Sequence, residues 1–355
     1  MCTDHQPNIA ILADDLTSAA DGAAPFVARG VTALIGRGQL PRQAATVVAV
    51  DSGSRSATSS QAFERVARLT PQLASRAVLY KTVDSTLRGH IAEELEACFA
   101  ASGRTSLVFA PAFPQAGRTT VGGIQLVDGI PVSESAYGHD PVHPARHSAL
   151  VDLVPSSIKN VTFLDAVTQE ELDSRIASIE GAESILWVGS PGMAAALSRR
   201  FVPEKTRPSL VDGISNDVLV VVGSANLRSH IQADRLPELS GVMLLRGPRA
   251  RERDSAAVLR RIAENAAREL RDPRFGVLIA TGGDTMEAVL DHINVQEFEI
   301  LQELDPGFPL GRARLGDGRS LMLAMKAGGF GSDDALERAV VRIRGTTQIL
   351  RTDSL

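Results

Sequence analysis

Short apolar runs alternate with stretches of helical spacing along the first half of the chain. Runs such as Ile9–Ala13 and Leu107–Ala110 end in polar residues or in a proline-containing loop. Apolar strands that alternate with helices are typical of a parallel sheet with helices on both faces. The other runs of this kind are Thr46–Val50, Ala77–Tyr80 and Ile185–Val188. The pattern therefore predicts a doubly wound α/β fold for this half.

Capping residues define the first predicted helix. Residues Ser18–Arg29 have helical spacing, and Gly30 is placed to act as a left-handed C-terminal cap before a strand over Val31–Ile35. Later in this half, a helix that begins at Asp165 or Thr168 is predicted through Ile179. Another is predicted to begin at Ser190-Pro191.

A tight turn interrupts this alternation. The runs Ile124–Val127 and Ile130–Val132 flank Asp128-Gly129, a dipeptide that readily adopts the positive backbone angles of a two-residue hairpin turn. We therefore expect a β-hairpin insertion in the N-terminal domain.

The chain is long enough for two domains, because single hydrophobic cores rarely grow to 355 residues. Residues 202–216 have neither helical nor strand period and contain two prolines and one glycine. We place the boundary there, giving domains at 1–205 and 206–355. Strand-like runs resume at 218–223, 242–246, 277–280 and 321–328, so the second domain is also predicted to be α/β with a mainly parallel sheet.

Composition narrows the class of partner. The chain is 44% hydrophobic and 22% charged with a net charge of −5, which gives no basic field for nucleic acid or an anionic membrane. Cys2 and Cys98 are too few for a disulfide framework, and no export signal or eighteen-residue apolar run is visible. We expect a cytoplasmic protein that acts on a small molecule.

Charged residues follow several predicted strands of the first domain. Asp14-Asp15, Asp51–Arg55 and Lys81–Gly89 all begin at strand ends, where open parallel sheets form their ligand crevice. Carboxylates can bind hydroxyls or a metal, whereas lysine and arginine neutralise a carboxylate or phosphate. Helix capping by Asp15 or Thr17, or a salt-bridged rim, is the structural alternative.

The segment Pro111–Thr120 is a proline-stiffened loop that carries Arg118. It is predicted either to form a wall of the same pocket or to be a rigid connector into the hairpin.

Three glycine turns follow strands of the second domain. They are Gly223-Ser224, Thr281–Thr285 and Lys326–Gly331, and free backbone N–H groups at such turns favour phosphate. Each alone could be a tight strand-to-helix turn, but three in one domain indicate a polyphosphate site. Together with the charged strand ends they predict phosphoryl transfer in an interdomain cleft, with domain closure excluding water.

Other motifs carry less weight. The chain contains no G-x-x-x-x-G-K-[ST] P-loop and no G-x-G-x-x-G, so the phosphate cradle must be of another type. His139, His143 and His147 are spaced by four, but Pro141 and Pro144 break the helix that would align them, and metal ligands stay unassigned. The basic run Arg246–Arg253 is interpreted as a solvated loop.

The ordered motifs resemble those of the four-carbon acid sugar kinase family, whose members phosphorylate acids such as D-threonate, D-erythronate and an oxidised isoapionate. The resemblance spans nearly the whole chain and is carried by ADDLTSAAD, DSGSRS, KTVDSTLRG, PAFPQAGRTTVGGIQLVDG, DPVHP, GSAN with Ser229 and Gln232, GGDT, PGFPLG and KAGGFG. It implies an N-terminal acid-binding domain and a C-terminal domain that binds ATP with Mg²⁺.

The resemblance and the strand-end residues together give the candidate site. The candidate substrate-binding residues are Asp14, Asp15, Arg55, Lys81, Thr82, Val83, Asp84, Ser85, Arg88 and Arg118. The candidate nucleotide-binding residues are Ser224, Gly282, Gly283, Asp284, Thr285, Lys326, Gly328 and Gly329. We expect Lys81 and Arg55 to hold the acid's carboxylate, and Asp84 or Asp14 to orient or deprotonate the attacking hydroxyl.

Departures from the family pattern leave an alternative open. Ser18 and Met286 stand where the family has Gly and Ser, and the chain is shorter than typical members around residues 148–162. A nucleotide or metabolite sensor of the same fold that has lost turnover is the second hypothesis, and a nicotinamide-dependent oxidoreductase is a distant third. A homodimer is compatible with the sequence, which does not decide the oligomeric state.

Overall fold

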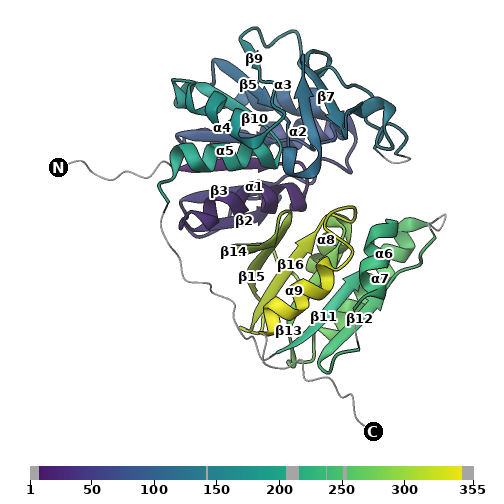
Figure 1. Cartoon of the computed structure of the whole chain (residues 1–355). Coiled ribbons are helices and arrows are strands. Elements are labelled where there is room, and N and C mark those ends of the chain that lie inside the picture. Colours follow the sequence, from purple (N-terminus) through teal and green to yellow (C-terminus); the bar gives the residue numbers. More distant parts are fainter. Residues whose placement is uncertain (1–7, 141–142, 205–215, 237, 251–253, 346–355) are drawn as a thin grey trace. The chain divides into compact units, whose positions relative to one another are not determined.

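The computed structural model describes residues 8–140, 143–204, 216–236, 238–250 and 254–345 (Figure 1). The chain divides into two compact units, Met1–Thr206 and Arg207–Leu355. The predicted domain boundary between residues 205 and 206 lies outside the described residues, as does the end of the basic run at 251–253. Each unit is an α/β structure with mainly parallel strands, which confirms the predicted fold class.

The first unit contains a parallel sheet with the strand order β2-β3-β1-β4-β10-β5-β9. Its strands are β1 (Ile9–Ala13), β2 (Ala33–Arg37), β3 (Val47–Asp51), β4 (Val78–Thr82), β5 (Ser106–Ala110), β9 (Val161–Phe163) and β10 (Ile185–Gly189). Its helices are α1 (Leu16–Ala28), α2 (Ser59–Leu73), α3 (Ile91–Ser102), α4 (Gln169–Ala177) and α5 (Pro191–Phe201). The predicted strands before residue 190 are thus confirmed to within two residues at each end.

Helices cover both faces of this sheet (Figure 1). Successive strand side chains point to opposite faces. Leu12 of β1 and Val50 of β3 belong to a core cluster with Leu69 of α2 and Leu95 of α3. On the other face α1 packs against β1, β2 and β3 and against α5.

Local capping explains the limits of α1. The helix begins two residues before the predicted Ser18, because the Asp15 side chain accepts a hydrogen bond from Ser18 N at 2.6 Å and so acts as the N-cap. Gly30 follows the helix with φ +92°, as predicted, and donates to Val27 O.

The predicted hairpin is confirmed and belongs to a small antiparallel sheet with the order β6-β7-β8. Its strands are β6 (Arg118–Val121), β7 (Ile124–Val127) and β8 (Ile130–Pro131). Asp128 and Gly129 form the turn with φ +49° and +82°. The prediction of a loop through Thr120 was wrong at its end, because Arg118–Val121 pairs with β7 as a strand.

The second unit contains a sheet with the order β12-β11-β13-β16-β15-β14, parallel from β12 to β16 and antiparallel beyond. Its strands are β11 (Asp217–Val222), β12 (Val242–Arg246), β13 (Phe275–Thr281), β14 (Glu297–Asp305), β15 (Phe308–Arg314) and β16 (Ser320–Lys326). Its helices are α6 (Leu227–Asp234), α7 (Ser255–Glu269), α8 (Gly283–His292) and α9 (Ala335–Arg344). The antiparallel strands β14 and β15 and the helix α9 were not predicted.

The strand order of each unit fixes where a ligand can bind. In the first unit β1 lies between β3 and β4, and in the second β11 lies between β12 and β13. The chain reverses its winding direction at such central strands, so the loops after them diverge and leave a crevice at their carboxyl ends. Among the described helices, none is long and apolar enough to cross a membrane.

Candidate active site

One guanidinium connects the strand ends of the first unit. Arg55 donates to both carboxylate oxygens of Asp14, with Nε 2.6 Å from Oδ2 and Nη2 2.8 Å from Oδ1. Its Nη1 lies 2.9 Å from Oδ2 of Asp15 and 3.9 Å from Oδ1 of Asp84. The loops after β1, β3 and β4 thus meet at this side chain, as the sequence predicted.

The arginines keep two of these carboxylates ionised. Burial would raise the pKa of Asp14, but the charges of Arg55 and Lys81 outweigh it and hold that pKa below its ordinary value. The pKa of Asp84 is also lowered, because Arg88 and Arg55 outweigh burial. Asp14 and Asp84 are therefore well suited to accept hydrogen bonds and poorly suited to take a proton at neutral pH.

Two predicted arginines share one aromatic ring. The Cζ atoms of Arg88 and Arg118 lie 5.3 Å and 5.6 Å from the ring centre of Tyr137. Arg118 Nη2 donates to the Tyr137 hydroxyl at 2.8 Å, and Arg88 Nε donates to Asp84 Oδ2 at 2.6 Å. Tyr137 was missed in the sequence, because it lies in an irregular loop without a periodic or glycine signal.

Lys81 carries a charge that acts on Asp14, and its side chain has no exposed surface. Its Nζ is 2.6 Å from Glu94 Oε2 and donates to Thr82 O at 2.7 Å. Burial lowers the pKa of Lys81, but Glu94 and Asp14 outweigh it and raise the pKa, so the ammonium stays charged. Glu94 on α3 was not predicted, although a lysine at the end of an apolar strand requires a buried partner.

The remaining candidates of this stretch are also interior. Thr82, Val83 and Ser85 are all buried, and the Ser85 carbonyl accepts a hydrogen bond from Gln125 Nε2 at 2.8 Å. These residues shape the strand end on which Asp84 and Arg88 stand.

Asp51, the last residue of β3, was not among the predicted site residues. It is 4% exposed, and its Oδ1 accepts a hydrogen bond from Gly53 N at 2.7 Å. Burial, together with the charges of Asp15 and Asp14, raises the pKa of Asp51 to about 7.

The three glycine turns of the second unit converge on Ser224. A Cβ atom built on Gly282 would lie 3.3 Å from Ser224 Cβ, and one built on Gly328 would lie 2.2 Å from Ser224 Oγ. Gly282 has φ +92°, and its N–H donates to Lys326 O at 2.8 Å. Glycine is required at these positions because a side chain would fill the space between the turns.

Helix α8 begins directly after Gly282, so the N–H groups of Gly283 and Asp284 precede the first backbone bonds of the helix, which Thr285 N and Met286 N make to Gly282 O. Asp284 is exposed in this turn, whereas Thr285 is buried. Helix N-termini of this kind favour phosphate. We call Ser224, the start of α8 and the turn 326–331 the glycine cradle, and its open backbone suits a nucleotide triphosphate.

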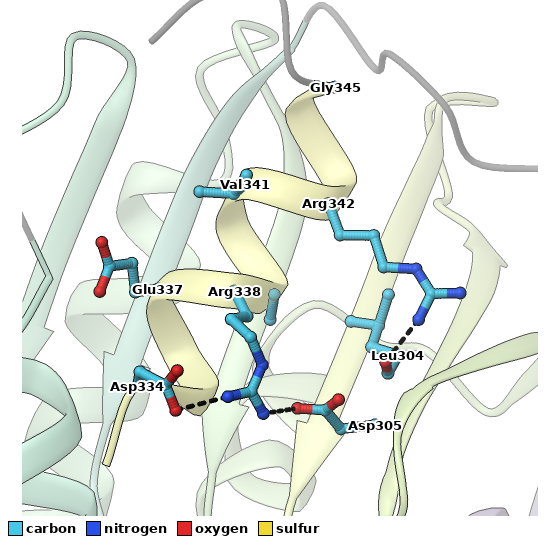
Figure 2. A pocket seen from close by; sticks show the side chains of 9 residues that line it. Leu304, Asp305, Asp334, Glu337, Arg338, Val341, Arg342 and Gly345 are labelled. Carbon is cyan, nitrogen blue, oxygen red and sulfur yellow. Dashed lines mark hydrogen bonds and ion pairs between the residues drawn. The ribbon is translucent and has the colours of Figure 1, made fainter. Parts of the chain in front are cut away.

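Two further features concern metals and cavities. Within the described residues, no group of three or more His, Cys, Asp or Glu side chains could hold a metal ion. An open pocket of about 570 Å³ lies on α9 and β14 (Figure 2) and contains none of the predicted site residues. In it Arg338 pairs with both Asp305 and Asp334, and Arg342 donates to the Leu304 carbonyl oxygen.

Comparisons with known proteins agree with the two-part architecture. A family model described as a sugar-binding N-terminal domain matches residues 9–236, and one described as a nucleotide-binding C-terminal domain matches residues 246–336. The D-threonate kinase of Bordetella bronchiseptica is 30% identical, over 95% of this chain and 98% of the relative. The 3-oxo-tetronate kinase of Pseudomonas fluorescens is 26% identical, over 96% of this chain and 98% of the relative. A Salmonella typhimurium structure described as a putative tRNA synthase superimposes with a TM-score of 0.77 over 93% of this chain and 98% of its own, and its 19% identity shows the fold alone.

Proposed function

The chain belongs to the four-carbon acid sugar kinase family, and we propose that it transfers the γ-phosphate of ATP to a hydroxyl of a four-carbon sugar acid. The convergence of three strand-end turns on Ser224 carries this proposal, because backbone N–H groups around a shared space suit a polyphosphate. The charged strand ends of the first unit supply the complementary chemistry for a hydroxylated acid.

The acid would bind to the first unit through its two kinds of charged group. Arg88 and Arg118, held against Tyr137, offer guanidinium N–H groups to the carboxylate. Asp14 and Asp84 stay ionised and accept hydrogen bonds from the hydroxyls, which orients one of them for attack.

Lys81 contributes to the acid site through its charge. Because its side chain is fully buried, its contribution is the positive charge that helps to keep Asp14 ionised. Arg55 has a similar part, since its N–H groups are directed to Asp14 and Asp15. The two residues expected to hold the carboxylate are thus proposed to organise its surroundings.

ATP would bind to the glycine cradle. The N–H groups of Gly283 and Asp284 begin α8, and the Ser224 hydroxyl and the turn at Gly328 and Gly329 lie beside it. Mg²⁺ neutralises charge on the phosphates when it is bound. We propose that the phosphates, water and the exposed Asp284 carboxylate hold it.

An ADP-release assay tests the proposal. The full-length protein is mixed with ATP and Mg²⁺ and offered D-threonate, D-erythronate or 3-oxo-tetronate, with butanoate as a four-carbon acid that lacks a hydroxyl. We expect ADP release with at least one of the three hydroxy acids and none above background with butanoate. Asp284→Ala should weaken the use of ATP whichever acid is offered. ATP binding without ADP release for any acid would favour the sensor hypothesis instead.

A further inference from the structure

Lys326 ends β16 and points its ammonium group at the turn that follows. Its Nζ lies 2.9 Å from the carbonyl oxygens of Ala327 and Phe330 and 3.5 Å from that of Gly328. The residue is 1% exposed. Since an ammonium group has three hydrogens, these carbonyls leave none for direct contact with a phosphate.

Helix α6 binds carbonyl groups of the same turn. Ser229 Oγ donates to Gly328 O at 2.9 Å. Gln232 Nε2 donates to Phe330 O at 3.0 Å and to Ser332 O at 2.8 Å. Both side chains are buried, so the carbonyls of the turn are fixed from within the protein.

Fixing the carbonyls also fixes the N–H groups. In a trans peptide the C=O and the following N–H point in opposite directions, and no cis peptide occurs in the described residues. The N–H groups of Gly328, Gly329 and Gly331 therefore point away from Lys326 and α6. Gly329 and Gly331 are exposed, and Gly328 lies against Ser224 in the glycine cradle.

We propose that Lys326, Ser229 and Gln232 are positioning residues that hold the turn 327–332 with its N–H groups toward the phosphates of ATP, and that ATP binding is accompanied by proton uptake at Lys326. The proposal rests on the proposed nucleotide site. It assigns to Lys326 an indirect role in the nucleotide binding that was expected of it from the sequence.

The surroundings of Lys326 explain why this side chain would take up a proton when ATP binds. Burial and the charge of Arg228 lower the pKa of Lys326 to about 7, so part of the population is neutral near neutral pH. The charged group that acts on Lys326 is Arg228 of α6, which is paired with Asp333 at 3.6 Å. His230 on α6 has a pKa that burial holds below its ordinary value. A bound triphosphate adds negative charge, which raises the pKa of Lys326 and draws a proton from the buffer.

Calorimetric titration of the full chain with ATP, without sugar acid, tests both the positioning role of these residues and the proton uptake at Lys326. Measurements near pH 8 in two buffers of different ionisation enthalpy give the number of protons taken up. We expect up to about one proton per ATP, because most Lys326 side chains are neutral about one unit above their pKa. Adenosine should bind without this uptake, since it carries no phosphate.

Variants separate positioning from simple loss of charge. Lys326→Met should weaken ATP binding about tenfold and abolish proton uptake, because the turn loses its buried donor. Lys326→Arg keeps a permanent charge, so it should abolish uptake with a smaller loss of affinity. Gln232→Ala should weaken binding about tenfold while leaving uptake in place. Lys159→Met, at an exposed lysine of the first unit, is the matched control and should match the wild type.

Two results would overturn the inference in different ways. Wild-type affinity and proton uptake in both Lys326 variants would refute the role of Lys326 and leave the proposed kinase function intact. A wild-type protein that binds no ATP would refute the proposed function itself. If Lys326→Met does not fold, Lys326→Arg and Gln232→Ala still decide the matter, because unchanged uptake in the first and unchanged affinity in the second contradict the proposal.

Discussion

Replacing Asp51 by asparagine should stabilise the first unit at neutral and alkaline pH. The carboxylate is 4% exposed at the end of β3, and its Oδ1 accepts a hydrogen bond from Gly53 N. Asparagine has the same shape and keeps an oxygen for that bond. The substitution therefore removes mainly the free energy of holding a buried negative charge beside Asp15 and Asp14.

The size and sign of the effect follow from the pKa. The pKa of Asp51 rises from an ordinary 3.8 to about 7 in the folded protein. Between these values the folded state binds more protons than the unfolded state, so wild-type stability falls as pH rises from about 4 to about 7 and is level above. A shift of about three units corresponds to about 4 kcal/mol, an upper limit for the gain in Asp51→Asn above pH 7.

Urea unfolding followed by tryptophan fluorescence measures this gain. The chain has one tryptophan, Trp187, which is fully buried in β10 and so reports on the first unit. The difference in unfolding free energy between Asp51→Asn and the wild type should grow from about pH 5 to pH 7. Glu64→Gln, at an exposed carboxylate of α2, is the control and should show no such growth. A variant that is less stable than the wild type at every pH would refute the reasoning.

Three further changes test the two sites. Lys81→Met leaves the buried Glu94 carboxyl without its ammonium partner, so it should lower unfolding free energy by about 3–5 kcal/mol in urea titrations, and adding Glu94→Leu should restore much of the loss. Gly282→Ala forces alanine into φ +92°, a strain of roughly 1–3 kcal/mol, and brings Cβ to 3.3 Å from Ser224 Cβ. Calorimetry should then show weaker ATP binding with acid binding unchanged. Arg88→Met should raise KM for the acid about tenfold or more and leave KM for ATP near the wild-type value in steady-state assays.

The strand-end chemistry of the first unit could be predicted because it depends on local pattern and on one topological rule. Asp14, Arg55 and Asp84 each follow an apolar run, and parallel strands gather their carboxyl ends at one edge. The partners of these residues could not be predicted in the same way. Glu94 accepts a hydrogen bond from the hydroxyl of Ser54, 40 residues away in the sequence. Tyr137 contacts Arg88 from an irregular loop.

The antiparallel part of the second unit was missed for a different reason. In Glu297–Asp305 the buried residues Phe298 and Ile300 alternate with half-exposed glutamates, a strand signal that becomes irregular at Leu301. The register with β15 shifts after Ile300, which accounts for that irregularity. A turn at Gly307 with φ +72° joins the two strands. The dipeptide Pro306-Gly307 is the sequence signal that indicates this turn.

Two lysines show why position in the sequence does not by itself assign a role. Lys81 is the penultimate residue of β4 and Lys326 the last residue of β16, and both side chains are buried. Lys81 meets the carboxylate of Glu94, and its pKa is raised. Lys326 donates to neutral carbonyls and faces the like charge of Arg228, and burial with this charge lowers its pKa to about 7. Lys81 therefore supplies a permanent charge, whereas Lys326 can gain a proton when an anion binds. This difference comes from the partners that the tertiary fold brings to each lysine.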